Sequence, residues 1–476
     1  MENSYKRILK GTAILGSVQV FTILVNLIRG KLIAIFLGTH GMGIYSLLNV
    51  SMTTIQQSSS LGLNLSIVKE ISSTKDQIKY LSIVRIARSL LYLTAILGAL
   101  VSLIFSSKLS LLTFGTDAYK YQYMLLSIVI LFTTVSNGEL SILQALGELK
   151  KIAYSSIVGA VSGLIIGIPL YYYWGYSGIV PSMICLSIIM FLFYAYNTRK
   201  IRGISNNLSW VRFYCISKRM IILGLVLMVS TTLGTLANYT LNSFIGRYGS
   251  ISDVGLYQAA NSMTNQYIGL VFSAMSLDYF PRLSSVSFDN AKIKVLVNQQ
   301  SEIILLIISP LAILFISLAP IIIRILLTKD FVVLVPMIRW MGIGMLFKAI
   351  AFPMGYISFA KGDKKTFFWL EGIFGNILIL SLNMIFYMVD GLRGLGISFA
   401  IAYFIFDIVY IFVTKNKYNF SHSKSLIYMI LPFFVMVLIT LFASFCKNLI
   451  FSNIIMSIMF LISLLVSWVG LRKRLK

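Results

Sequence analysis

The chain has 476 residues, of which 58% are hydrophobic and only 12% are charged, and its mean hydropathy is +0.88. This balance excludes an ordinary soluble globular protein and indicates a membrane protein. The formal net charge of +25 would suit a nucleic-acid-binding protein. The basic residues instead recur in short clusters between apolar stretches, so we expect no nucleic-acid partner.

Apolar stretches of membrane-spanning length follow one another along the chain. Since about 20 apolar residues cross the hydrocarbon as a helix, the sequence predicts an all-α membrane protein with about 14 spans. The spans cover residues 12–37, 42–66, 83–105, 121–143, 152–174, 177–197, 220–245, 254–277, 302–326, 332–359, 366–388, 394–414, 426–446 and 449–471. The start of the chain shows no cleavage signal, so we expect the first stretch to remain as a helix.

The lysines and arginines between the spans predict the orientation. An even number of spans places both termini on one side of the membrane, and most of the 40 lysines and arginines fall in the loops on that side. Such loops are cytoplasmic by the positive-inside rule. Both termini are therefore predicted to be cytoplasmic, where the basic residues also meet anionic membrane lipids.

An internal repeat predicts the domain organisation. GIYSLLNVSMT at 43–53 recurs as GLYQAANSMT at 255–264, each time at the start of the second helix of its half. Many transporters are built from such repeats, with a site between them. The predicted parts are an N-terminal six-helix lobe at 1–197, a basic cytoplasmic linker at 198–219, a C-terminal six-helix lobe at 220–414, and an additional helix pair with a basic tail at 415–476.

Polar residues form stripes on four of the predicted helices. At helical spacing they share one face of each helix, and we expect these faces to line a wet cavity. The alternative is that they pack helix against helix, as small and amide residues do in membranes. The stripes contain Gln19, Thr22, Asn26 and Arg29; Tyr45, Asn49, Thr53, Gln56, Ser60 and Asn64, with Gln57 beside them; Thr231, Thr235, Asn238 and Asn242; and Tyr257, Asn261 and Asn265.

Charged residues within or at the ends of the spans are candidate functional groups, because a charge at membrane depth is costly. The basic candidates are Arg29, Lys31, Arg85, Arg88, Arg339 and Lys348. Anchoring at the interface is the alternative for Arg29, Lys31 and Arg339. Arg85 and Arg88 could instead be ordinary basic residues of the cytoplasmic side. Glu139 and Asp407 are candidate ion-coupling residues or partners of the cations. Glu302 and Glu371 are expected at the interface.

No constellation of catalytic residues is present. The chain has no Gly-rich phosphate loop followed by Lys-Ser or Lys-Thr and no HExxH motif. Its two histidines fall in loops, and its three cysteines have unrelated spacings. We therefore expect no enzyme, no catalytic residues, no cofactor and no metal site.

The helices predicted at 426–446 and 449–471 carry neither a charge within the span nor a polar stripe and are expected at the periphery.

Four segments together resemble O-antigen and polysaccharide flippases of the multidrug, oligosaccharidyl-lipid and polysaccharide exporter superfamily. They are NLIRGKLIAIFLGTHGMGIYSLL at 26–48, SIVKEIS at 66–72, GLYQAAN at 255–261, and LDYFPRLSSV at 277–286, which precedes Asp289 in a loop. We expect the segment 66–72 to be a short loop. The resemblance implies a bacterial inner-membrane flippase that moves an undecaprenyl-pyrophosphate-linked oligosaccharide by alternating access. It also implies two lobes around a cationic cavity and a lipid-tail groove at the extra helix pair.

The resemblance also implies roles for the candidate residues. The six basic candidates would meet pyrophosphate and anionic sugars, and Asn49, Gln56, Gln57, Asn261 and Asn265 would meet sugar hydroxyls. Polysaccharide polymerase or assembly proteins would be partners.

Two other functions remain open. One is an ion-coupled antiporter for drugs or organic cations, which would need an acidic or aromatic cavity. The other is a scaffold of a polysaccharide assembly complex without transport of its own.

Overall fold

The computed structural model describes residues 2–475 except 74–76, 200, 202–209 and 447. These residues form helices and short connections without any strand, so the predicted all-α fold is confirmed. Contacts divide the chain into unit 1, Met1–Gly255, and unit 2, Leu256–Lys476.

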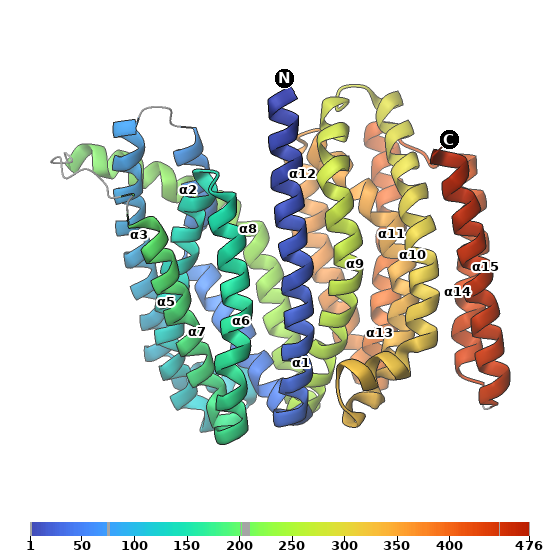
Figure 1. The fold of residues 1–476 in the computed structure, drawn as a ribbon, viewed down its shortest axis with the longest axis horizontal. Helices are drawn as coiled ribbons and strands as arrows, with labels where there is room; N and C mark the ends of the chain where they lie inside the picture. The colour runs from blue at the N-terminus through green and yellow to red at the C-terminus, as the bar shows by residue number, and fades with distance from the viewer. Residues whose placement is uncertain (1, 74–76, 200, 202–209, 447, 476) are drawn as a thin grey trace. The chain divides into compact units, whose positions relative to one another are not determined.

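Unit 1 contains eight α-helices and the first turn of a ninth within its described part. They are α1 (Glu2–Ser59), α2 (Leu63–Ser72), α3 (Gln77–Ile104), α4 (Ser106–Phe114), η1 (Asp117–Tyr119), α5 (Lys120–Ala145), α6 (Leu149–Trp174), η2 (Gly175–Gly178), α7 (Ile179–Thr198), α8 (Trp210–Tyr248) and the start of α9 (Ile251–Ser285). In Figure 1 α5, α6 and α7 lie side by side, with α5 packed on α3 and α6 packed on α1.

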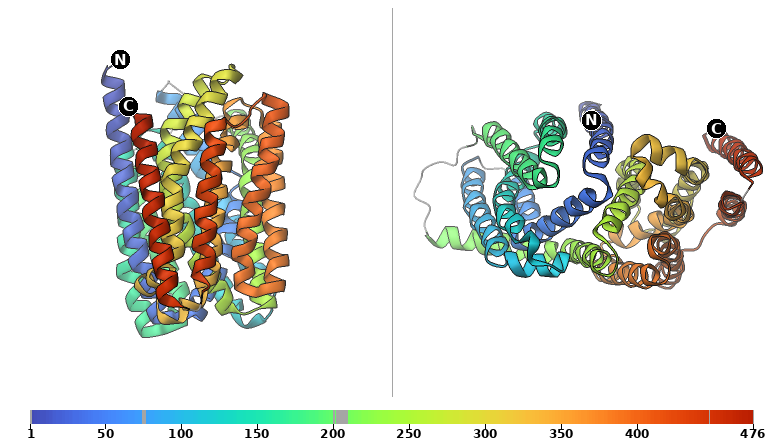
Figure 2. Two further views of the ribbon diagram at one scale, coloured as in Figure 1. Left: turned by 90° about the vertical axis from the view of Figure 1, so that its right-hand side faces the viewer. Right: turned by 90° about the horizontal axis from the view of Figure 1, so that it is seen from below.

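Unit 2 contains the rest of α9 and the helices that follow it. They are α10 (Asn290–Leu326), η3 (Lys329–Leu334), α11 (Val335–Ala360), α12 (Lys364–Phe367), η4 (Phe368–Phe374), α13 (Gly375–Tyr418), α14 (Lys424–Ser444) and α15 (Leu449–Leu475). The centre of the unit is α11, which packs on α10 and α13. The pair α14 and α15 packs mainly on α10, at the edge of unit 2 in Figures 1 and 2, as predicted for the periphery.

The long helical stretches agree with the predicted membrane spans. Nine stretches of the described chain are long and apolar enough to cross a membrane. Leu149–Thr198 and Lys364–Tyr418 each contain two predicted spans, and Ser17–Ser59 covers most of the first two, 12–37 and 42–66. The predicted spans 220–245 and 254–277 lie within α8 and α9. The chain is thus a multi-pass membrane protein, and the cytoplasmic side of its termini stays a prediction.

Glycine breaks two of these long stretches where one predicted span ends and the next begins. Gly38 interrupts α1 with φ 63° and ψ −165°, and Gly391 interrupts α13 with φ 53° and ψ −135°. This backbone region is essentially restricted to glycine because a Cβ atom would clash. Each break separates two consecutive predicted spans.

One predicted loop is wrong. The second span was predicted to run to residue 66 and the segment 66–72 to be a loop, but α1 ends at Ser59 and 66–72 lies in α2. Leu61 (φ 51°) and Gly62 (φ 64°) turn the chain in the left-handed region. The new helix then buries Ile67 and Ile71 against α3, α5 and α8, which stabilises it as a helix.

The division between the units differs from the predicted lobe boundary. The sequence groups residues 220–255 with the second lobe, whereas α8 contacts α1, α2 and α4 and clusters with unit 1. The predicted lobes, the linker at 198–219 and the terminal pair stay predictions. Residues 202–209 of that linker lie outside the described residues.

Candidate functional site

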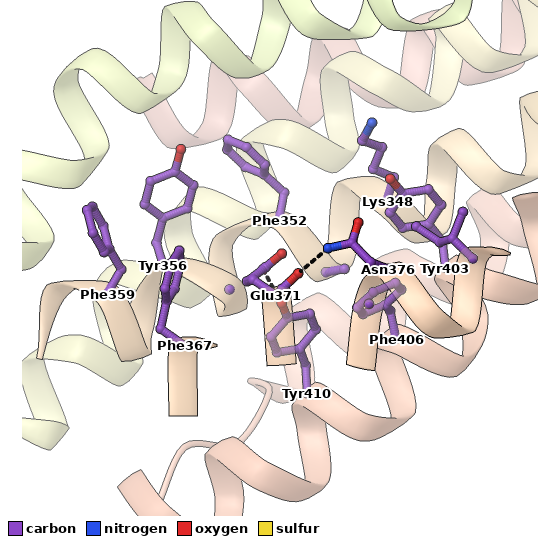
Figure 3. A pocket seen from close by; sticks show the side chains of 14 residues that line it. Lys348, Phe352, Tyr356, Phe359, Phe367, Glu371, Asn376, Tyr403, Phe406 and Tyr410 are labelled. Carbon is purple, nitrogen blue, oxygen red and sulfur yellow. Dashed lines mark hydrogen bonds between the residues drawn. The ribbon is translucent and has the colours of Figure 1, made fainter. Parts of the chain in front are cut away.

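A cavity of about 430 Å³ lies within unit 2 between α11, α12, η4 and α13 (Figure 3). Its wall carries one carboxylate, Glu371, one ammonium group, Lys348, and one amide, Asn376. Aromatic rings form much of the remaining wall: Phe352, Tyr356, Phe359, Phe367, Tyr403, Phe406 and Tyr410. The cavity is therefore aromatic and carries both signs of charge.

A π-helical turn, η4, positions Glu371. A π-helix widens the backbone and leaves carbonyl groups without their usual partner, and such turns are frequent at functional sites. The Asn376 amide donates to the Gly372 carbonyl oxygen at 2.7 Å and to the Glu371 carbonyl oxygen at 3.3 Å. Asn376 thus provides hydrogen bonds to the carbonyl groups of the widened turn, and this turn directs the Glu371 side chain toward the cavity.

The Glu371 carboxylate is held against the cavity wall. The buried Tyr410 hydroxyl donates a hydrogen bond to Oε1. On the other side Gly355 makes room, because a Cβ atom there would lie 2.9 Å from the same oxygen. A glycine on α11 and a tyrosine on α13 therefore fix the orientation of this acid.

Lys348 stands where the large cavity meets a smaller one. Its Nζ lies 3.4 Å from Asn265 Oδ1 and 5.2 Å from the centre of the Tyr403 ring. The Asn265 amide in turn donates to Asn261 Oδ1 at 2.9 Å. These two asparagines line a cavity of about 120 Å³ together with Tyr257 and Asn383, and Tyr403 lines both cavities.

The predicted residues Lys348, Asn261 and Asn265 thus come together. Among the described residues, no carboxylate forms an ion pair with Lys348. Glu371 lines the same cavity as Lys348 without forming an ion pair with it. Tyr257, on the same predicted stripe, is buried beside them.

In unit 1, Arg29 lies on α1 with its guanidinium against α6. Its Nη2 donates to the Tyr45 hydroxyl at 3.4 Å, with the guanidinium carbon 5.8 Å from the centre of that ring. Gly163 leaves room for it, since a Cβ atom there would lie 3.0 Å from Nη1. Arg29 Nε is buried without a hydrogen-bond partner among the described residues. The predicted pair Arg29 and Tyr45 is therefore in contact, and it has no acidic partner in the described part of the chain.

Arg88 and Glu139, both predicted as site residues, form an ion pair instead. Arg88 Nε and Nη2 donate to the two Glu139 carboxylate oxygens at 2.6 and 2.9 Å, and Nη1 donates to the Ile201 carbonyl oxygen at 2.9 Å. The Glu139 side chain is only 5% exposed. This arrangement matches the partner role that the sequence left open for Glu139.

Arg339 and Asp407 also lie apart from the cavities. Arg339 Nη1 donates to the Ser444 carbonyl oxygen at 2.8 Å, at the end of α14. This is a contact that a cation commonly makes with helix C-termini. Asp407 is buried, and neither carboxylate oxygen has a hydrogen-bond partner among the described residues.

The remaining predicted site residues differ in solvent exposure. Arg85 and Asn238 are exposed, and Asn242 and Gln56 are buried. Asn242 donates to Asn238 within α8 at 2.8 Å, a contact between helix neighbours. The half-buried ones are Asn26, Lys31, Asn49 and Gln57.

Sequence reasoning missed the acid and the aromatic wall of the large cavity. Glu371 was expected at the interface, yet it faces the cavity. The signal was present in α13, where Tyr403, Phe406 and Tyr410 follow at spacings of three and four residues and so share one face.

Comparison with known proteins supports the fold and the family. The family described as "Polysaccharide biosynthesis protein" matches residues 32–336. A lipid III flippase of Escherichia coli (strain K12) is 22% identical over 356 residues, which cover 73% of this chain and 83% of the relative, and the lipid III flippase of Shigella flexneri matches equally.

Solved structures share the fold. The lipid II flippase MurJ in an inward closed conformation superposes with a TM-score of 0.75 at 18% identity, covering 97% of this chain and all of the other. An inward-facing multidrug resistance MATE family transporter of the MOP superfamily gives a TM-score of 0.69 at 16% identity, covering 85% of this chain and 98% of the other. These relatives are flippases and transporters, in agreement with the prediction that the chain is not an enzyme. Because the family match covers more than half of its length, the chain belongs to the polysaccharide biosynthesis protein family.

Proposed function

We propose that this chain is a flippase that moves an undecaprenyl-pyrophosphate-linked oligosaccharide, an O-antigen or related polysaccharide repeat unit, across a bacterial inner membrane. The substrate would pass from the cytoplasmic to the periplasmic leaflet by alternating access. The family and the two lipid III flippases support transport of a lipid-linked saccharide. Polysaccharide polymerase or assembly proteins are the proposed partners.

The observation that carries the proposal is the environment of Arg29. A cation at membrane depth costs at least about 2.5 kcal/mol, and Arg29 has tyrosines rather than an acid beside it. An anionic ligand would remove that cost, because guanidinium binds phosphate oxygens through charge-assisted hydrogen bonds. Arg29 is therefore proposed to bind the pyrophosphate.

Lys348 is the proposed second anion-binding residue. It lacks a directly bound carboxylate in the described part of the chain, and the amides Asn261 and Asn265 beside it suit sugar hydroxyls. Lys31, Arg85, Asn49, Gln56 and Gln57 stay proposed contributors. Arg88 is left out because Glu139 and backbone oxygens already occupy its guanidinium.

Asp407 is the proposed ion-coupling residue. Glu139 is committed to Arg88, whereas the buried carboxyl of Asp407 has no hydrogen-bond partner among the described residues and can take up a proton or a metal ion. In proteoliposomes, Asp407→Asn is expected to make transport insensitive to the driving ion gradient. Unchanged gradient dependence would remove Asp407 from the mechanism.

The test of function is a strain deleted for this chain. We expect surface polysaccharide to disappear while finished lipid-linked repeat units accumulate facing the cytoplasm, and the wild-type gene to restore both. Normal surface polysaccharide would overturn the proposal. Lost polysaccharide together with no flux by the purified, reconstituted chain would instead support the scaffold.

A second candidate is an antiporter for organic cations, favoured by the acid and aromatic rings of the large cavity. Carboxylates and aromatic faces both attract cations, and Glu371 faces seven such rings. Lys348 on the same wall opposes a simple cation. Sensitivity of the deletion strain to cationic drugs with normal surface polysaccharide would favour this candidate over the flippase.

A further inference from the structure

The Glu371 carboxylate has spare capacity to accept hydrogen bonds from a ligand. Tyr410 donates to Oε1, whereas a carboxylate has about four acceptor positions. Glu371 faces the cavity as an exposed side chain. Gly355 lies against Oε1, and the Tyr410 hydrogen bond orients the carboxylate. A ligand in the cavity therefore meets a fixed acceptor with negative charge.

The aromatic wall favours the same kind of ligand group. Rings on α11 form one side of the wall, with Phe352 edge-on to Tyr356 at 5.0 Å, and Phe280 on α9 lies 5.9 Å from Tyr356 outside the lining. Across the cavity, Phe406 and Tyr410 stack at 5.8 Å. Aromatic faces carry negative potential and attract ammonium groups, and they also pack against apolar ring faces. The wall thus suits a ring that carries a positive charge.

Lys348 brings a positive charge to the same cavity, on the side of Tyr403 and Asn376 in Figure 3. Its ammonium group lies against Asn265 and the ring of Tyr403, so it does not form an ion pair with Glu371. A ligand that is only cationic would be repelled there, and a ligand that is only anionic would be repelled by Glu371. A ligand with an amine and an anionic group satisfies both charges.

We infer that the large cavity of unit 2 binds a sugar ring with a free amino group, its amine at Glu371 and an anionic part of the same ligand at Lys348. This inference rests on the proposed flippase function and names its substrate class as an amino-sugar-containing repeat unit. The smaller cavity, lined by Asn261, Asn265 and Asn383, would receive hydroxyl groups of a neighbouring neutral sugar. Glu371 is thus a specificity-determining residue.

The experiment measures binding to the purified full chain in lipid nanodiscs with three probes: glucosamine 1-phosphate, N-acetylglucosamine 1-phosphate and glucose 1-phosphate. All three carry the phosphate, and only the first carries an ammonium group. We expect glucosamine 1-phosphate to bind about tenfold more tightly than the other two, the size of one charge-assisted contact. Glu371→Gln should reduce that ratio to about one, whereas Glu148→Gln, at an exposed surface pair with Lys151, should leave it unchanged.

Tyr410→Phe provides a second variant that keeps the charge. It removes the hydroxyl that orients Glu371, so it should lower the preference for the amine without abolishing it. Equal binding of the three sugar phosphates to the wild type, or a preference that persists in Glu371→Gln, would overturn the inference while leaving the flippase intact. If rhodamine 6G bound through Glu371 and none of the sugar phosphates bound, the proposed function itself would fail.

Discussion

Gly255 lies directly against Gly43: a Cβ atom on Gly255 would stand 2.7 Å from the Gly43 backbone nitrogen and 2.2 Å from the Thr39 carbonyl oxygen. The contact is reciprocal, because a Cβ atom on Gly43 would stand 1.8 Å from the Ile251 carbonyl oxygen. Thr39 and Ile251 each precede their repeat's glycine by four residues. The first glycines of the two repeat copies therefore contact each other in a locally reciprocal way, through backbone atoms.

Alanine at either glycine is expected to destabilise the protein. Backbone atoms form both contacts and cannot rotate away, so the added methyl group should cost about 1–3 kcal/mol as overpacking does. The measurement is the apparent unfolding temperature of purified Gly43→Ala and Gly255→Ala. Gly30→Ala is the control on the same helix, because a Cβ atom there meets nothing within 4 Å. An unchanged unfolding temperature for both test variants would contradict the close contact.

Much of the fold follows from span length and glycine position, while the details of the site do not. The hairpins at Gly38 and Gly391 fall where apolar stretches end, since span length is a strong constraint. The turn at Leu61 and Gly62 was missed because the apolar pattern runs through it. It depends on burial of Ile67 and Ile71 by other helices.

The candidate site was predicted where neighbours share a helix face and missed where distant segments pair. Asn261 and Asn265 are four residues apart, so their contact is visible in the sequence. Arg88 and Glu139 are 51 residues apart, and nothing in the local pattern indicates that they pair. Glu371 faces a cavity because a π-helical turn shifts its direction, which helical spacing of 3.6 residues does not anticipate.

Arg29 and Arg339 are expected to behave differently, although the sequence assigned both to substrate binding. Arg29→Ala should abolish export with normal amounts of protein in the membrane, because it removes the proposed pyrophosphate contact. Arg339→Ala should lower the unfolding free energy by about 1.5–3 kcal/mol through the lost hydrogen bond to Ser444, with export retained. The measurements are surface polysaccharide and protein level in the complemented deletion strain. Full export by Arg29→Ala would contradict the proposed binding of the pyrophosphate by Arg29. Loss of export by a stable Arg339→Ala would instead support a substrate-binding role for Arg339.

Breaking the Arg88–Glu139 ion pair is expected to be costly. Glu139→Gln leaves the Arg88 guanidinium, 22% exposed, without its charge partner, a change that typically costs about 3–5 kcal/mol when the pair is buried. The exchange Arg88→Glu with Glu139→Arg should recover only part of the loss, since the contact with the Ile201 carbonyl oxygen needs a donor on α3. A double-mutant cycle of unfolding temperatures measures this coupling. Additive effects of the two single changes would show that the pair contributes nothing.

Acid is expected to weaken the docking of the loop that joins α13 to α14, through His422. Burial of its ring, whose nitrogens have no partner among the described residues, lowers its pKa from 6.5 to about 4. The unfolded chain therefore binds the proton first as the pH falls, so His422 contributes stability above pH 6.5 that is lost progressively as the pH falls toward about 4. The flanking residues hold the loop to α10, where Asn298 donates to the Ser421 carbonyl oxygen and accepts from the Ser423 backbone nitrogen.

Unfolding temperatures of the purified protein between pH 7.5 and 4.5 test this dependence. His422→Gln should flatten the decline in that interval, because glutamine does not titrate there. His40→Gln, at an exposed position of α1, should leave the decline as it is in the wild type. If His422→Gln and the wild type lost stability in parallel, the acid sensitivity would have to come from other groups, and the buried imidazole would not control the docking of the loop.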